Sequence, residues 1–150
     1  MQTVVIQEQL PVYSSAEVEI DAPIEAVWRI LTAIERWPAW NPDVKSASLD
    51  GRVVEGATFR WKAGRSTIGS TVVHLDAPRL IAWTGQTFGI RAVHVWHLTS
   101  TNGRTLARTE ESYEGFVARI LRRPLQKVLD RTLTDGAHHL KVEAESHDAG

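Results

Sequence analysis

The dipeptide Asn102-Gly103 constrains the fold of this chain more than any other feature of its sequence. It separates two strand-like segments, 90–101 and 104–114. Asn and Gly both tolerate the positive φ that a two-residue hairpin turn requires at its centre. The dipeptide therefore predicts an antiparallel hairpin whose register is fixed by the turn.

That register places an ionisable pair and an aromatic side chain on one face of the hairpin. Counting outward from the turn, Trp96 lies opposite Thr109 and His94 lies opposite Glu111. The other face is more polar, so this one is expected to point inward. Cross-strand neighbours have Cβ atoms about 4.5–5.5 Å apart, which brings imidazole and carboxylate within reach of each other. His94 and Glu111 are candidates for general acid and base catalysis; the alternative is a satisfied polar pair that orients a pocket or fixes register.

A second hairpin turn is expected at Ala63-Gly64, at the end of the alternating segment 57–63. It pairs Trp61 with Ser66 and continues the inward face through Phe59. A third turn is expected over the four residues 76–79.

The third turn, over 76–79, pairs His74 with Ile81 and Val72 with Trp83. The second and third turns then place Trp61 and Trp83 on the same, inward face. The inward residues expected from these two hairpins are Phe59, Trp61, Val72, His74 and Trp83.

The order of elements indicates an α+β fold, because the strands run together and the helices lie at the ends. One long helix against a curved antiparallel sheet covers its face incompletely, which favours an internal pocket. Pro124 is expected to kink the last helix or to mark a junction within it. The expected elements are a strand ending at Ile20, a helix over 23–35, strands over 44–49, 57–63, 66–75, 80–86, 90–101 and 104–114, and a helix over roughly 116–145.

The last helix carries two features of its own. Apolar residues at helical spacing predict a broad apolar stripe along it. Its first turns contain a cluster of arginines, which is either a solvated basic face or a site for an anionic group. The stripe comprises Leu121, Leu125, Val128, Leu129, Leu133, Leu140 and Ala144, and the cluster comprises Arg119, Arg122 and Arg123.

Tryptophan is in excess: it supplies six of the eleven aromatic residues. Fully burying six indoles in 150 residues is difficult, because each is large and carries one N–H that needs a partner. A cavity would give several of them half-buried places. Trp37 and Trp40, in a Pro-rich loop, are expected to border its entrance.

Composition excludes several classes of function. Seventeen Lys and Arg against eighteen Asp and Glu leave no basic excess for nucleic-acid binding. The chain has no cysteine, and His94 and His97 point to opposite faces of one strand, so no metal site can be assembled. No cofactor motif occurs, so neither metal nor cofactor is expected. The sequence contains no long apolar run and no signal peptide, which predicts a cytoplasmic protein without membrane insertion.

Several segments together resemble the SRPBCC superfamily, and most closely its polyketide cyclase/dehydrase-like branch. Glu19–Trp28 followed by Trp37–Pro42 is similar to the opening of that family. Leu80–Gly85, His94–Trp96 and Thr109–Gly115 fit the same branch. The resemblance covers nearly the whole chain, about residues 14–146.

The resemblance implies a helix-grip, START-like fold, in which a seven-stranded curved antiparallel sheet wraps around a long C-terminal helix and encloses a cavity. It implies one domain over 14–146, with 1–13 as a tail or an added edge strand and 147–150 as a tail. Some relatives carry a mononuclear iron site, but the sequence offers no set of two histidines and one carboxylate. Oligomeric state stays open, since 1–12 could pair across a sheet edge and form a homo-oligomer.

Three functions are compatible with this fold. The first is binding of a small, largely apolar or aromatic molecule, lipid-like or polyketide-like, in the cavity. The second is a cyclase or dehydratase in which His94 and Glu111 move protons. The third is an adaptor of the Hsp90-activator type, which would show a closed interior and a large exposed apolar patch. The expected ligand-binding residues are Trp37, Trp40, Phe59, Trp61, Val72, His74, Trp83, Trp96, Thr109 and Tyr113.

Overall fold

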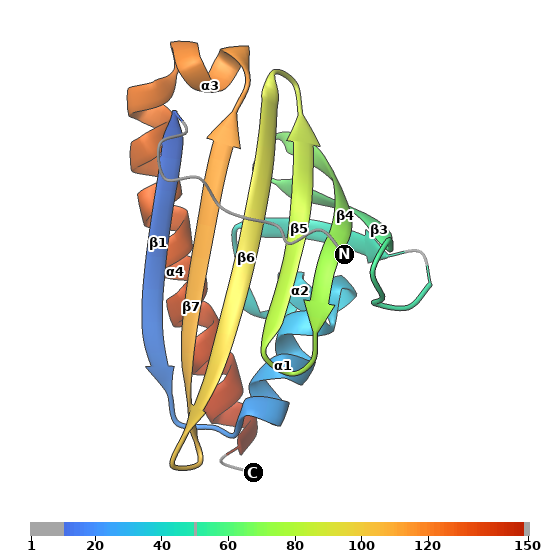
Figure 1. The fold of residues 1–150 in the computed structure, drawn as a ribbon, viewed down its shortest axis with the longest axis vertical. Coiled ribbons are helices and arrows are strands. Elements are labelled where there is room, and N and C mark those ends of the chain that lie inside the picture. The colour runs from blue at the N-terminus through green and yellow to red at the C-terminus, as the bar shows by residue number, and fades with distance from the viewer. Residues whose placement is uncertain (1–10, 50, 149–150) are drawn as a thin grey trace.

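A single curved sheet and one long helix dominate the computed structural model, which describes residues 11–49 and 51–148. Within those residues seven antiparallel strands pair in the order β1-β7-β6-β5-β4-β3-β2, and α4 lies along the sheet (Figure 1). This confirms the predicted helix-grip architecture. The elements are β1 (Val12–Ile20), α1 (Ile24–Thr32), a 3-10 turn (Ile34–Arg36), α2 (Trp37–Trp40), β2 (Val44–Leu49), β3 (Thr58–Ala63), β4 (Ser66–Asp76), β5 (Leu80–Thr87), β6 (Ile90–Thr101), β7 (Arg104–Glu114), α3 (Phe116–Ile120) and α4 (Arg122–Asp148).

The hairpin of β6 and β7 has the register that the sequence predicts. Asn102 and Gly103 form its turn with φ of 51° and 79°. His94 lies opposite Glu111, and Trp96 lies opposite Thr109. The positive φ at both turn residues is what Asn and Gly permit, and it fixes the pairing of the whole hairpin.

The turn between β3 and β4 is one residue further along than expected. Gly64, with φ of 60°, and Arg65 form it, so Trp61 lies opposite Ile68 rather than Ser66. The partner therefore shifts by two residues. Because side chains alternate with a period of two, this shift leaves Trp61 on the inward face.

The expected position of His74 is wrong because β4 contains a bulge. Val72 pairs with Trp83 as predicted, but the register shifts before His74, which lies opposite Ala82 instead of Ile81. An extra residue in one strand reverses the alternation beyond it. His74 therefore shares the face of Ala82, which alternates with the inward-facing Trp83.

The helical segment after Ile120 is divided. The chain leaves α3 at Leu121, and α4 begins at Arg122. Pro124 lies in the first turn of α4, where a residue without an N–H loses no intrahelical hydrogen bond. Pro124 thus marks a junction, one of the two outcomes that the sequence allowed.

The ends of the domain differ from the expected limits where the structure describes them. β1 begins at Val12, and α4 continues to Asp148, which places 147–148 in the helix rather than in a tail. Residues 1–10 of the tail or edge strand expected over 1–13, and the last two residues of the chain, lie outside the described residues. No helix of 11–49 or 51–148 combines the length and apolar character needed to cross a membrane.

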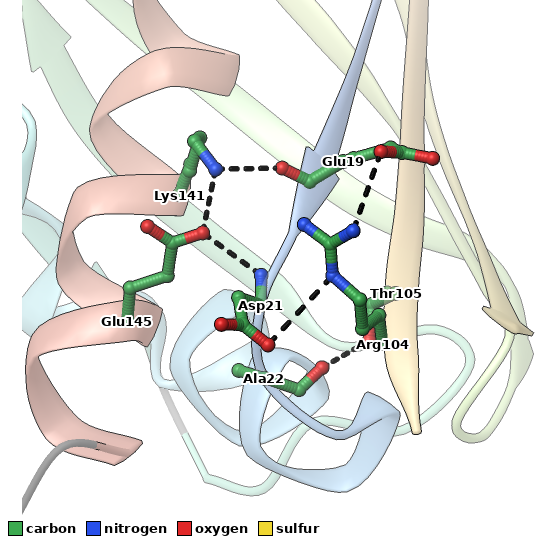
Figure 2. A network of polar contacts seen from close by, with 7 residues as sticks. All are labelled: Glu19, Asp21, Ala22, Arg104, Thr105, Lys141 and Glu145. Atoms are coloured by element: carbon green, nitrogen blue, oxygen red, sulfur yellow. Dashed lines mark hydrogen bonds and ion pairs between the residues drawn. The ribbon is translucent and has the colours of Figure 1, made fainter. Parts of the chain in front are cut away.

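A polar network ties the C-terminal half of α4 to the end of β1 (Figure 2). Lys141 donates to the backbone carbonyl of Glu19 at 2.9 Å and pairs with Glu145, which accepts the Asp21 N–H at 2.8 Å. Arg104 reaches the carboxylates of Glu19 and Asp21 at 3.6 and 3.7 Å. The Asp21 N–H and the Lys141 ammonium hold the pKa of Glu145 below its ordinary value. The network fixes where the sheet meets the helix.

Thr105 makes the one buried hydrogen bond drawn in Figure 2, from its hydroxyl to the Ala22 carbonyl at 2.7 Å. Thr105→Val keeps the shape but leaves that carbonyl without its donor, so we expect a loss of about 1–3 kcal/mol in the free energy of unfolding. Urea denaturation measures it. The same change at exposed Thr101, in the same hairpin, is the control and is expected to cost under about 0.5 kcal/mol. Equal losses in both variants would contradict a role for the hydrogen bond.

Candidate functional site

A cavity of about 300 Å³ lies between the inner face of the sheet and the helices. Its walls come from β2 to β7 on one side and from α1, α2 and α4 on the other. Eight of the side chains predicted for the site line it: Trp37, Trp40, Trp61, Trp83, His94, Trp96, Glu111 and Tyr113.

The other four predicted residues do not line the cavity. Phe59, Val72 and Thr109 are buried but do not line it. His74 lies on the opposite face because of the bulge in β4. Phe59 belongs to the core because Trp37 of α2 packs on it, with ring centroids 5.6 Å apart.

Aromatic rings form a continuous wall along the cavity. The Trp37 ring centroid lies 5.6 Å from Phe59, 5.9 Å from Trp61 and 5.2 Å from Trp83. The first two contacts are edge-to-face, a favourable arrangement of ring quadrupoles. The Trp37 N–H is satisfied by the Leu31 carbonyl at 3.0 Å. The wall is thus held in place by the helix that precedes it.

His94 continues this wall between two indoles. Its ring lies 4.7 Å from Trp83 and stacks at 6.0 Å on Trp96, at an interplanar angle of 24°. A face of the imidazole, rather than an edge, is therefore packed among aromatic rings.

Both nitrogens of His94 face protein groups. Nε2 lies 2.7 Å from the Thr109 hydroxyl, which donates its single proton to the Val95 carbonyl at 3.2 Å. With its proton on the Val95 carbonyl, that hydroxyl accepts from His94, and this hydrogen-bond pattern assigns the proton to Nε2. Nδ1 is buried and lies 3.4 Å from Oε1 of Glu111. The buried Thr109 hydroxyl thus fixes the tautomer that leaves Nδ1 unprotonated toward the carboxyl group.

Burial keeps both members of this pair neutral. It raises the pKa of Glu111 to about 8 and lowers the pKa of His94 to about 3. Each side chain is 12% exposed, and desolvation disfavours the charged form of both. The protonated carboxyl can direct its O–H toward the bare Nδ1. The Glu111 charge and burial raise the pKa of the nearby Tyr113 phenol, so it too stays protonated.

The family assignment follows from comparison with known proteins. Residues 12–145 match a family described as polyketide cyclase/dehydrase and lipid transport. The chain belongs to that family. No curated protein matches it.

Solved structures share the fold of this family member at low sequence identity. The Zhui aromatase/cyclase from Streptomyces sp. R1128 is 17% identical with a TM-score of 0.79, over 90% of this chain and 94% of that one. TTHA0849 from Thermus thermophilus is 19% identical with a TM-score of 0.78, over 90% and 98%. A START superfamily protein from Mycobacterium smegmatis is 17% identical with a TM-score of 0.68, over 91% and 97%. These similarities establish the START-like fold.

Small residues make room for the cavity in this polyketide cyclase/dehydrase family member, and the sequence analysis missed most of them. Gly85 and Ala92 face each other on β5 and β6, and both line it. Gly136 lines it from α4, with Asn41 Nδ2 3.9 Å from the position of an added Cβ. The available signal was small residues at inward positions between large aromatic ones.

Two polar residues at the cavity were also missed. Asn41 and Asp43 line it, and the Asn41 side-chain oxygen accepts the Asp43 N–H at 3.0 Å. They follow the predicted Trp40, whose indole N–H is buried and has no hydrogen-bond partner within the described ranges. Elsewhere in 11–49 and 51–148, no group of three or more His, Asp or Glu residues gathers to hold a metal ion.

Proposed function

We propose that this protein binds a compact, apolar aromatic molecule in its cavity. The observation that carries the proposal is the aromatic wall with neutral polar groups at one place along it. A cavity of about 300 Å³ lies at the lower end of the roughly 300–1,000 Å³ typical of ligand sites. That size suits a ring system better than a two-chain lipid. The family supports a small hydrophobic ligand of this class.

The polar corner of the cavity, which we define as His94, Glu111 and Tyr113, determines which polar group the ligand needs. The Tyr113 phenol can donate a hydrogen bond to the ligand, and so can the carboxyl when its O–H turns from His94 to the cavity, so the ligand is expected to present an acceptor oxygen there. A carbonyl or hydroxyl on a ring fits this requirement. An anionic group does not, because it would be buried without a cation among the lining residues.

Binding is expected to alter tryptophan fluorescence, since four indoles of the wall would contact the ligand. The probe is 2-naphthol, a small aromatic alcohol. Ala92→Phe fills the cavity between Gly85 and Tyr113, and we expect it to weaken binding at least tenfold. Val93→Phe, one residue along on the opposite face, is the matched control and should bind as the wild type does. Native mass spectrometry of freshly purified protein would identify a co-purified molecule.

An absence of any spectral change, with no co-purified molecule, would count against binding. So would equal weakening by both phenylalanine variants, because the outward one does not reach the cavity. The adaptor function is not proposed, since its discriminating sign is a large exposed apolar patch together with a closed interior, and this interior holds a cavity.

A second candidate function is acid–base catalysis of an aldol-type cyclisation and dehydration. It is favoured by one observation: Glu111 is a protonated carboxyl beside an aromatic binding site. In such a reaction the α-carbon of a ketone bonds to a second carbonyl carbon, and the α-proton passes to the oxygen of that carbonyl. A further proton and the new hydroxyl then leave as water. Glu111 can give a proton to the oxygen and take one from carbon.

His94 has a different role in this mechanism from the one the sequence suggested. Its two nitrogens contact Thr109 and Glu111 rather than the cavity. It is therefore a positioning residue that holds the carboxyl group and can accept its proton. Glu111 is the group that would touch the substrate.

A further inference from the structure

Four large apolar side chains are exposed at one end of the molecule. Phe88 in the turn between β5 and β6 is 82% exposed, and Ile120 at the end of α3 is 76% exposed. Phe116 and Leu121 are 57% and 46% exposed. Figure 1 shows α3 and that turn together at the top of the view. We call these four residues the apical patch.

The two parts of the apical patch are held against each other. The rings of Phe88 and Phe116 meet edge-to-face at 5.7 Å. The Val117 N–H donates to the Gly89 carbonyl at 3.1 Å, and a Cβ on Gly89 would lie 2.2 Å from Val117. Only glycine permits this close approach, and Gly89 also has a φ of 70°, which other residues rarely adopt. Contacts between the two segments therefore hold the apical patch in a defined shape.

The side of α3 that faces the protein explains why these residues point outward. Ala118 is fully buried in a cluster with Val12, Leu129 and Leu133. Its neighbours along the helix are thereby directed to solvent. Leu121, which the apolar stripe of the sequence was expected to bury, is exposed at the junction between α3 and α4.

Positive charge flanks the apical patch on α3 and the first turns of α4. Residues 115–129 contain Arg119, Arg122, Arg123 and Lys127 and no acidic residue, although the chain as a whole has a net charge of -1. The three arginines are exposed and form no ion pair within the described residues. Apolar side chains flanked by unpaired arginines are complementary to a surface that is anionic outside and apolar beneath.

The patch is continuous with the cavity. Leu125 and Val128, one and two turns along α4 from Leu121, line the cavity, and Val128 is 44% exposed. Thr87 and Ile90, on either side of Phe88 and Gly89, line it too. A surface that covers the apical patch would therefore adjoin the cavity wall.

We propose that the apical patch docks onto an anionic phospholipid membrane, so that the cavity exchanges its ligand with the bilayer. The apolar residues project from a turn and a helix end instead of lining a groove, which suits insertion between lipids better than an extended protein partner. Arg119, Arg122 and Arg123 would contact phosphate headgroups. Ligand exchange rests on the proposed function, whereas docking does not.

The test uses the full chain with one cysteine introduced at Ile120 and labelled with a polarity-sensitive dye, because the native sequence has no cysteine. The probe surfaces are vesicles of phosphatidylcholine alone and of equal parts phosphatidylcholine and phosphatidylglycerol. We expect a blue shift of the dye with the anionic vesicles only, reversed by high salt. The same label at Val142, 53% exposed on α4, should not respond.

Vesicle sedimentation then tests the residues. Phe88→Ser with Phe116→Ser is expected to weaken partition at least tenfold, and glutamine at Arg119, Arg122 and Arg123 roughly a hundredfold. Val54→Ser, an exposed apolar residue away from the patch, is the matched control.

Three results would overturn the proposal: no blue shift with anionic vesicles, equal binding by the patch variants, or binding that needs an added acidic protein. Quenching by 2-naphthol is measured on the same variants. If docking fails while quenching persists, the cavity proposal stands alone. If quenching fails while docking persists, ligand binding is the proposal that is wrong.

Discussion

Glu111→Gln is expected to make the protein more stable, by about 5 kcal/mol at pH 9. Glutamine has the shape of the protonated carboxyl and can donate to Nδ1 of His94 in the same way. It never ionises, so it avoids the cost of placing a charge in the desolvated polar corner. The free energy of unfolding, measured by urea denaturation at each pH, gives the difference between variant and wild type.

The sign follows from the proton balance of folding. Burial raises the pKa of Glu111 from 4.5 to about 8, so between these values the folded state binds the proton more tightly than the unfolded state. Wild-type stability from this group is therefore full below pH 4.5 and is lost as the pH rises to about 8. Glutamine does not titrate, so the gap should open through this window and stay constant above it.

Glu110→Gln is the matched control. Glu110 lies on the opposite face of β7 and pairs with Arg108 at 2.6 Å. Removing a partly exposed ion pair is expected to lower the stability, by under about 1 kcal/mol. If Glu111→Gln were instead less stable than the wild type from pH 6 to 9, Glu111 would be ionised and paired with a protonated His94.

His94 is expected to give the mirror-image pH dependence. Burial lowers its pKa from 6.5 to about 3, so the unfolded state binds the proton more tightly between these values. Wild-type stability is thus lost as the pH falls from 6.5 toward 3. In His94→Gln this slope should disappear, whatever the cost of losing the stacked ring. A slope that persists in the variant would assign it to another group.

How far the sequence predicts this site depends on how local the signal is. Asn102-Gly103 fixes the register of β6 and β7, because the backbone geometry of a two-residue turn is set by the turn residues themselves. That is why the His94–Glu111 pairing could be predicted without a structure. At the turn after β3, Gly64 is compatible with a turn at Ala63-Gly64 or at Gly64-Arg65, and the predicted turn was wrong by one residue. The period of two preserved the face.

The bulge in β4 and the depth of the cavity wall could not be predicted in this way. The bulge accompanies the bend of a sheet that wraps around a helix, and no residue type in Val72-Val73-His74 predicts it. Whether an inward residue touches ligand space depends on the elements opposite it. Phe59 is buried because Trp37 covers it, and that contact joins segments that are 22 residues apart in the chain.

Glu111→Gln is also expected to abolish acid–base turnover while leaving binding intact. If Glu111 transfers protons in the proposed cyclisation, its loss should lower the rate by about 10²–10⁴-fold. The assay follows ring formation from a synthetic poly-β-ketone by absorbance, alongside 2-naphthol binding by fluorescence. Above pH 8 the wild-type rate should fall as the pH rises, because the carboxyl then loses the proton that it must donate.

Thr109 provides a finer test of the same mechanism, because its hydroxyl fixes the His94 tautomer without touching the cavity. Thr109→Val removes the acceptor for Nε2–H, so the proton can move to Nδ1 and face Glu111. We expect about a tenfold loss of rate and a displaced pH profile, with Thr109→Ser close to the wild type. A positioning role requires that difference, since a purely structural hydroxyl would lower stability but leave the pH profile in place. If both Glu111→Gln and His94→Ala turn over as the wild type does, the polar corner serves binding alone.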